Sequence, residues 1–285
     1  MGLLRTYFRS AASRMHDDQA EITLADFQRY FPHTPAALCV KECARLSALR
    51  RHSCPAPILD VGCGDGLFAS VAFENAEVWG IDIDAREGRW AAASRAYSQV
   101  VLADVTSAKL PEAFFETCIA NCSLEHVPRI DLAMQNIFRS LKPGGRVFMF
   151  VPNKIWAQHL LSYRFLSAIG ATGLATTLQN GIDNFFRHEH LYDDAGWRKV
   201  LLDAGFVVEA MDPVLSSATT VAFEALLVPS LAGKLNKTLT TRWTNFPAAR
   251  RALSLPVYAL AKSLLDHNDQ TPTAEFLAIG RRPEV

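Results

Sequence analysis

The fold of this chain is decided by one stretch, Ile58-Leu59-Asp60-Val61-Gly62-Cys63-Gly64-Asp65-Gly66-Leu67. An apolar run typical of a buried strand leads into three alternating glycines, and a helical pattern follows. Glycine has no Cβ, so a ligand can approach the backbone of such a loop closely. The dinucleotide-binding spacing Gly-x-Gly-x-x-Gly would need a third glycine at 67, where this chain has leucine. With the carboxylate of Asp60 at the strand end, the loop therefore favours a positively charged group over a pyrophosphate.

Strand and helix patterns alternate from this loop onward. Strands are predicted at 57–61, 77–81, 99–102, 117–120 and 146–151, and amphipathic helices at 67–75, 85–97 and 130–141. A helix at 193–204 and strands at 206–211 and 273–279 extend the pattern. Lys142-Pro-Gly-Gly145 is expected to stop one helix and turn into the next strand. This alternation predicts an α/β fold in which helices cover both faces of a parallel sheet.

Three segments fall outside the alternation. An N-terminal helical cap is expected over residues 1–52, with an amphipathic helix near 1–15, a helix capped by Thr23 and another beginning at Pro35. The main domain would then be residues 53–285, with helical insertions at about 153–187 and 212–270. These insertions are candidates for a lid or for a wall on the substrate side.

Composition excludes several classes of protein. The 285 residues include 29 Lys plus Arg and 29 Asp plus Glu, and 49% are apolar. A chain this apolar offsets its ordering entropy by burial, so disorder is not its dominant state. A net charge of zero argues against a nucleic-acid partner, which would call for a basic surplus. No apolar run reaches the ~18 residues of a membrane-spanning helix, and no Cys-x-x-Cys pair occurs among the six cysteines, so a cytoplasmic protein with reduced thiols and no metal is expected.

Two further acidic residues follow predicted strands. Asp82 ends the strand at 77–81, where a carboxylate can accept both hydroxyls of a ribose. Asp104 follows the strand at 99–102 and could accept an exocyclic adenine amine. Together with the glycine loop, these positions outline a nucleoside site along one edge of the sheet.

The ordered set of motifs resembles class I S-adenosylmethionine-dependent methyltransferases of the small-molecule branch. The motifs are Asp60-Val-Gly-Cys-Gly-Asp-Gly66, Gly80-Ile-Asp82, Ala103-Asp104-Val105, Asn121-Cys-Ser-Leu-Glu-His126 and Leu141-Lys-Pro-Gly-Gly145. The resemblance implies a Rossmann-like, doubly wound sheet of seven strands, mostly parallel, with an antiparallel last strand at 273–279. It covers about 57–151 and does not identify the substrate.

The resemblance also assigns cofactor contacts for S-adenosyl-L-methionine. It implies that Asp60, Gly62, Cys63, Gly64 and Gly66 hold the methionine end. Asp82 would bind the ribose, Asp104 with Val105 the adenine, and Asn121 would line the donor from the end of the fourth strand. Ile83, next to Asp82, is a further expected cofactor contact.

Histidines supply the candidate catalytic groups. His126 follows the fourth strand, and its pKa class suits a base near neutral pH. His188 and His190 precede the helix at 193–204 and are candidates for the rim of the active site, since two histidines with one carboxylate make a poor zinc site. For each of the three, ordinary polar packing stays open as the alternative.

The sequence therefore predicts methyl transfer to a small molecule, most simply at a hydroxyl of a sugar-, lipid- or metabolite-like acceptor. A hydroxyl acceptor needs a base, whereas a neutral amine or a stabilised carbanion does not. N- or C-methylation, an NAD(P)-dependent oxidoreductase and a non-catalytic S-adenosylmethionine-binding module stay open as alternatives. The apolar insertions, with Arg242, Arg250 and Arg251 in the second, are also compatible with peripheral membrane contact or with packing in a homodimer.

Overall fold

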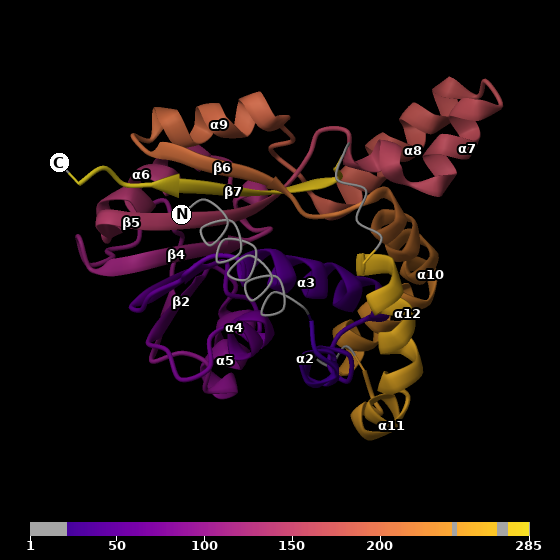
Figure 1. Cartoon of the computed structure of the whole chain (residues 1–285), viewed down its shortest axis with the longest axis horizontal. Coiled ribbons are helices and arrows are strands. Elements are labelled where there is room, and N and C mark those ends of the chain that lie inside the picture. The colour runs from indigo at the N-terminus through magenta and orange to yellow at the C-terminus, as the bar shows by residue number, and fades with distance from the viewer. Residues whose placement is uncertain (1–21, 241–243, 267–272, 285) are drawn as a thin grey trace, which may run out of the picture.

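The computed structural model describes residues 22–240, 244–266 and 273–284. Its centre is a seven-stranded sheet in the order β3-β2-β1-β4-β5-β7-β6 (Figure 1). Only β7 runs antiparallel to its neighbours, β5 and β6, which confirms the predicted topology. The strands are β1 (Ile58–Val61), β2 (Val78–Asp82), β3 (Gln99–Leu102), β4 (Phe115–Asn121), β5 (Leu141–Pro152), β6 (Val207–Pro213) and β7 (Glu275–Arg281).

Helices cover both faces of the sheet, and a group of them stands at one end of it (Figure 1). They are α2 (Leu24–Tyr30), α3 (Ala36–Leu49), α4 (Leu67–Ala72), α5 (Ala85–Ser94), α6 (Ile130–Ser140), α7 (Leu161–Ala168), α8 (Thr172–Phe186), α9 (Asp194–Asp203), α10 (Ser217–Thr240), α11 (Pro247–Ala252) and α12 (Ser254–Asp266), with 3₁₀ turns η1 (Leu124–His126) and η2 (Trp156–His159). None of the described helices is both long and apolar enough to cross a bilayer.

The alternation of side chains along β1 determines which face each residue serves. Leu59 and Val61 pack in the core beneath α6 and α9, whereas Ile58 packs in the core beneath α2, α3 and α4. Because the side-chain period of a strand is two, Asp60 points to the same face as Ile58. The carboxylate is therefore buried beneath the N-terminal helices.

These N-terminal helices are tied together by polar contacts. Thr23 and Asp26 form the capping box of α2, and both carboxylate oxygens of Asp26 accept hydrogen bonds from Arg50 at 2.7 Å. α2 packs against α12, and α3 packs against α10. The predicted helix near residues 1–15 lies outside the described residues.

Two local expectations need correction. The 142–145 stretch does not form a turn before the strand, because β5 already begins at Leu141 and the pairing with β4 is irregular there. Gly145 allows this, since a Cβ would lie only 2.9–3.2 Å from backbone oxygens of Lys142, Glu116 and Phe115. In addition, the helical insertion expected at about 212–270 contains three separate helices among its described residues, α10, α11 and α12. Pro247 lies in the first turn of α11, where a backbone N–H has no partner within the helix.

Candidate functional site

The glycine loop between β1 and α4 has the left-handed conformation that its sequence predicts. Gly62, Gly64 and Gly66 have φ angles of 72°, 54° and 80°. A Cβ on Gly62 would lie 2.4 Å from the Cβ of Ser123, so the loop packs tightly against the end of β4 there. At Gly64 nothing lies within 4 Å of an added Cβ. One side of the loop is therefore closed by protein and the other is open.

Asp60 lies beneath this loop and is almost fully buried. Its carboxylate accepts a hydrogen bond of 2.7 Å from the Tyr97 hydroxyl. Burial raises the pKa of the Asp60 carboxyl to about 7, and the hydrogen bond from Tyr97 only partly opposes that shift. Within the described part of the chain, Asp60 forms no ion pair. A ligand cation would stabilise its charged form.

The other predicted donor contacts lie along the same edge of the sheet. Asp82 accepts hydrogen bonds from the Gly64 N–H at 2.9 Å and from the Asp84 N–H at 2.8 Å, which fixes it beside the loop. Ile83 is 74% exposed, Val105 is buried, and the exposed Asp104 accepts from the Thr106 N–H. Asp60 and Asp82 thus lie at the ends of the adjacent strands β1 and β2, and Asp104 follows the next strand, β3.

A cavity of about 140 Å³, here called the glycine-loop pocket, opens over Asp60. Its lining residues come from the cap helices and the segment between them, from the ends of β1 and β4, and from the loop and the start of α4: Tyr30, Thr34, Leu38, Glu42, Asp60, Gly62, Cys63, Gly64, Asp65, Leu67, Phe68 and Asn121. The Tyr30 hydroxyl is buried and has no hydrogen-bond partner among the residues that the structure describes. The contribution of the cap helices was not predicted, because no motif near Tyr30 or Glu42 indicates a ligand.

A second cavity of about 260 Å³, here called the histidine pocket, adjoins the first. Both are lined by Leu38, Glu42 and Asn121, so they meet there. The Asn121 side-chain nitrogen donates to Glu42 at 2.9 Å, whereas its oxygen is buried without a partner. The remaining lining residues are Lys41, Arg45, Cys122, Glu125, His126, Pro152, Trp156, Phe186, His188, Leu215, Thr220, Phe223, Ala274 and Glu275.

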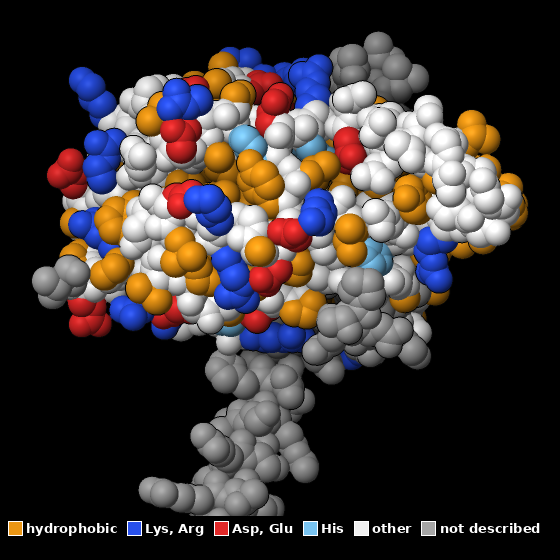
Figure 2. All heavy atoms as spheres, turned by 90° about the horizontal axis from the view of Figure 1, so that it is seen from above, with side chains coloured by type: hydrophobic (Ala, Val, Ile, Leu, Met, Phe, Trp, Pro, Cys, Tyr) orange, Lys and Arg blue, Asp and Glu red, His pale blue; other side chains and the backbone are white. Residues whose placement is uncertain are grey.

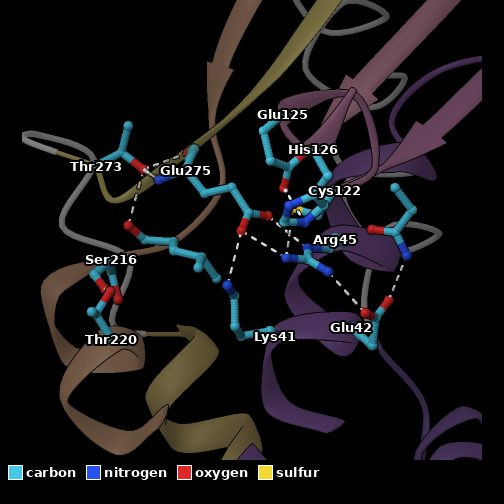
Figure 3. Close-up of polar contacts among 12 residues, drawn as sticks. Lys41, Glu42, Arg45, Cys122, Glu125, His126, Ser216, Thr220, Thr273 and Glu275 are labelled. Carbon is cyan, nitrogen blue, oxygen red and sulfur yellow. Dashed lines mark hydrogen bonds and ion pairs between the residues drawn. The ribbon is translucent and has the colours of Figure 1, made fainter. Parts of the chain in front are cut away.

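A buried ion-pair network forms one wall of the histidine pocket (Figure 3). Arg45 of α3 donates to both carboxylate oxygens of Glu275, at 2.6 and 2.8 Å, and to Glu42 at 2.8 Å. Lys41 lies 3.3 Å from Glu275. Burial alone would raise the pKa of Glu275, but Arg45 and Lys41 outweigh it and lower that pKa to about 2. No sequence motif predicted this network, because its partners are 230 residues apart.

The structure brings two of the three predicted histidines to the pocket. The rings of His126 and His188 stack with centroids 5.5 Å apart. Nδ1 of His126 lies 3.0 Å from the Arg187 carbonyl oxygen, and Nδ1 of His188 lies 3.3 Å from Asp183. Since carbonyls and carboxylates accept hydrogen bonds, both contacts place the proton on Nδ1 and leave Nε2 as the basic nitrogen.

His190 does not line the pocket. Its ring nitrogens lie 2.9 Å from the Tyr192 hydroxyl and 3.0 Å from the Val127 carbonyl oxygen. The ring therefore joins two loops behind the pocket rather than facing a ligand.

Glu125 is the group at this pocket that sequence reasoning left without a role. It is buried, one carboxylate oxygen lies 3.7 Å from Nε2 of His126, and the other has no hydrogen-bond partner. Burial raises the pKa of Glu125, with His126 opposing the shift. Among the described residues no group of three or more His, Cys, Asp or Glu is arranged to hold a metal, and Cys39 and Cys43 are buried in the core.

Comparison with known proteins identifies the core of this arrangement. Residues 59–149, which include the glycine loop and the ends of the first strands, match the family model described as a methyltransferase domain. This segment is a class I S-adenosylmethionine-dependent methyltransferase domain. S-adenosylmethionine is accordingly the cofactor of its family.

Relatives of this methyltransferase domain cover parts of the chain. An uncharacterized methyltransferase of Mycobacterium tuberculosis is 36% identical over 115 residues, which are 37% of this chain and 57% of that protein. A ubiquinone biosynthesis O-methyltransferase of Pseudomonas putida is 29% identical over 160 residues, 53% of this chain and 65% of the relative. The chain thus matches less than two thirds of the length of either relative.

The fold extends further than the sequence similarity. The solved structure of a geranyl diphosphate C-methyltransferase from Streptomyces coelicolor superposes with a TM-score of 0.53 over 84% of this chain and 77% of that one. Sequence identity is only 13%, so this likeness concerns the fold.

The residues over the methyltransferase loop fit the family's cofactor. A zwitterionic amino-acid tail offers an ammonium group to Asp60 and acceptors to the Tyr30 hydroxyl, and both groups are buried at the glycine-loop pocket. The open side of Gly64 leaves the backbone accessible. The chemistry of these donors and acceptors thus matches the methionine end of the cofactor.

Proposed function

We propose that the chain transfers a methyl group from S-adenosylmethionine to a hydroxyl group of a small-molecule acceptor. One observation carries the proposal: two adjoining pockets share Glu42 and Asn121, and three buried polar atoms without partners face them. These atoms are the Tyr30 hydroxyl, one oxygen of Asn121 and one oxygen of Glu125. Buried polar atoms are rarely left without partners, so the three indicate ligands on both sides of the junction.

In this proposal the glycine-loop pocket holds the donor. Asp60 binds the ammonium group, the loop from Gly62 to Gly66 follows the methionine end, and Asp82 binds the ribose. Ile83 and Val105 cover the adenine, and Asp104 accepts its amine. Asn121 stands at the boundary with the acceptor.

The histidine pocket would hold the acceptor. The aromatic rings of Trp156, Phe186 and Phe223 supply an apolar wall, while Glu125 and His188 supply polar groups. This mixture fits a molecule with an apolar body and a hydroxyl group. The name of the P. putida relative, an O-methyltransferase, supports oxygen over nitrogen or carbon as the methylated atom.

His188 is the group that we propose as the general base. Asp183 accepts a hydrogen bond from the Trp156 ring nitrogen at 2.9 Å and orients His188 through Nδ1. Burial lowers the pKa of His188, with Asp183 opposing the shift, so its neutral form is available at neutral pH. His126 stacks beside it and Glu125 lies behind His126, which makes both positioning residues in this proposal.

The chemistry needs only positioning and a proton acceptor. When bound, the cofactor supplies the methyl group on a sulfonium, whose leaving group is already activated. The chain holds the acceptor oxygen in line with that carbon, an effect that can be worth ~7–11 kcal/mol. Nε2 of His188 would take the proton of the acceptor hydroxyl, and the sulfonium would supply the methyl group to the acceptor oxygen and leave as a neutral thioether.

Two measurements test the proposal. Isothermal titration should detect binding of S-adenosylmethionine, and Asp60→Asn should weaken it, with Asp194→Asn, a half-buried residue on α9 that pairs with Arg198, as the control. Methyl-labelled donor incubated with a cell extract should then label a small molecule. Donor binding without any labelled product would instead indicate a binding module, and no donor binding at millimolar concentration would exclude the proposal.

A further inference from the structure

Helices α7 and α8 form a hairpin that projects from the body of the molecule (Figure 1). Leu161, Phe165 and Ile169 follow one another at intervals of four residues, so they form a single stripe along α7. They are 57–62% exposed, and Leu174 at the start of α8 is 63% exposed. α7 has no buried residue, and α8 has only Ala175. Exposed apolar side chains gathered on one element indicate a surface that is covered in use.

This hairpin is also nearly free of charge. Residues 161–186 contain one basic residue, Arg164, and one acidic residue, Asp183, whose carboxylate contacts Trp156 and His188, although 20% of the whole chain is charged. In Figure 2 the hairpin forms the right-hand projection, mostly white and orange, whereas blue and red side chains are spread over the rest of that face. The hydroxyls of Thr176 and Thr177 donate to backbone carbonyls of Thr172 and Gly173. These two hydroxyls therefore do not depend on water as their acceptor, which lowers the cost of moving this part of the surface out of water.

We propose that the hairpin docks on a lipid bilayer, with Leu161, Phe165, Ile169 and Leu174 inserted below the headgroups. A protruding element with apolar side chains and internally bonded hydroxyls fits a deformable lipid surface. Arg164 is exposed within the hairpin and can contact anionic headgroups. This inference does not depend on methyl transfer.

The hairpin is joined directly to the histidine pocket. Phe186 at the end of α8 and Trp156, just before α7, both line that pocket, and their rings pack edge to face at 5.7 Å. Docking would therefore hold the pocket close to the membrane surface.

The second insertion also exposes apolar side chains, since Phe246, Leu253, Leu255 and Leu260 are 60–74% exposed. Arg250, one of the arginines considered for membrane contact, donates to the carbonyls of Phe31 and Thr34 and stacks on the Phe31 ring. It ties α11 to the cap helices. Arg242 lies outside the described residues.

Vesicle flotation with the full-length protein tests the proposal. The large vesicles contain phosphatidylcholine alone or phosphatidylcholine with about 30% phosphatidylglycerol. The wild type should float with both, more strongly with the anionic vesicles. Phe165→Ser/Ile169→Ser should reduce the bound fraction about tenfold or more, and Arg164→Gln should remove only the preference for anionic vesicles. The matched control is Leu202→Ser on α9, where Leu202 is 59% exposed but lies outside the hairpin.

Each outcome decides for or against the bilayer. Thermal melting and donor titration first establish that the variants are folded. Equal flotation of the double variant and the control would overturn the proposal, as would a wild type that floats with neither vesicle. A wild-type dimer that becomes monomeric in the double variant, without flotation of either, would assign the stripe to a second copy of the chain.

Discussion

The glycine-loop pocket and the histidine pocket share Glu42 and Asn121, but each contains a buried carboxylate whose pKa is shifted in the opposite direction. Asp60 is buried beside a tyrosine, and burial raises its pKa to about 7. Glu275 is equally buried, but Arg45 and Lys41 overcome the effect of burial and lower its pKa to about 2. The first carboxylate has no cationic partner among the described residues, whereas the second is paired with Arg45 and Lys41. A cation could therefore be added by a ligand at Asp60 but not at Glu275, which is what the proposed donor site requires.

The largest expected effect concerns the proposed base of the histidine pocket, His188. His188→Ala should lower turnover of the labelled acceptor about 10²–10⁴-fold, because it removes the proposed base. Donor affinity should stay unchanged. His190→Ala is the matched control, since its ring nitrogens bond to Tyr192 and Val127 away from the pocket. Equal losses in the two variants would remove the catalytic role of His188.

The ion-pair network should be the most sensitive point for stability. Arg45→Ala leaves Glu275 as a buried charge with only Lys41 nearby, which should cost about 3–5 kcal/mol in urea unfolding. Arg50→Ala removes a partly exposed pair with Asp26 and should cost only about 1 kcal/mol. If Arg45→Ala proved as mild as Arg50→Ala, the network would not be what holds the histidine pocket open.

Substitutions at two glycines of the loop distinguish an effect on packing, measured as stability, from an effect on ligand access, measured as donor affinity. Gly62→Ala should destabilise the fold by about 2–4 kcal/mol, because left-handed strain adds to a collision with Ser123. Gly64→Ala should cost about 1–2 kcal/mol, since nothing lies near its added Cβ. It should nevertheless weaken donor binding, which titration calorimetry on the folded variant would measure. Unchanged affinity would place the donor away from Gly64.

The fourth expected effect is a pH dependence with a definite sign. The folded-state pKa of Asp60, about 7, lies above its ordinary value of 3.8. Its stabilising contribution is therefore present below pH 3.8 and is lost as the pH rises through 7. Asp60→Asn should raise the melting temperature more at pH 8 than at pH 5.

Donor binding should show the opposite trend, because the ammonium group favours the charged carboxylate. Affinity should rise up to about tenfold per pH unit between pH 5.5 and 7 in the wild type and stay flat in Asp60→Asn. A wild type with flat affinity over that range would show that Asp60 does not pair with the donor.

The sequence allowed the sheet and the positions of Asp60, Asp82 and Asp104 to be predicted, because each depends on residues close together in the chain. A strand, a turn and a helix start leave local patterns, and parallel strands bring their carboxyl ends to one edge. Arg45 and Glu275 leave no such pattern, since a lone arginine on a helix and a lone glutamate on a strand resemble surface residues. Tyr30 was missed for the same reason. The helices at 153–187 and 212–270 were expected, but which of their side chains face the histidine pocket depends on tertiary packing.

The placement of Glu275 on β7 has a consequence for how the protein is made. Arg45 and Glu275 are 230 residues apart in the sequence. Because ribosomes add about 5–20 residues each second, Glu275 is synthesised roughly 10–50 s after Arg45. Asp60 and the glycine loop leave the ribosome early in that interval. All the residues that line the glycine-loop pocket lie between positions 30 and 121, so they are synthesised before Glu275 completes the wall of the histidine pocket.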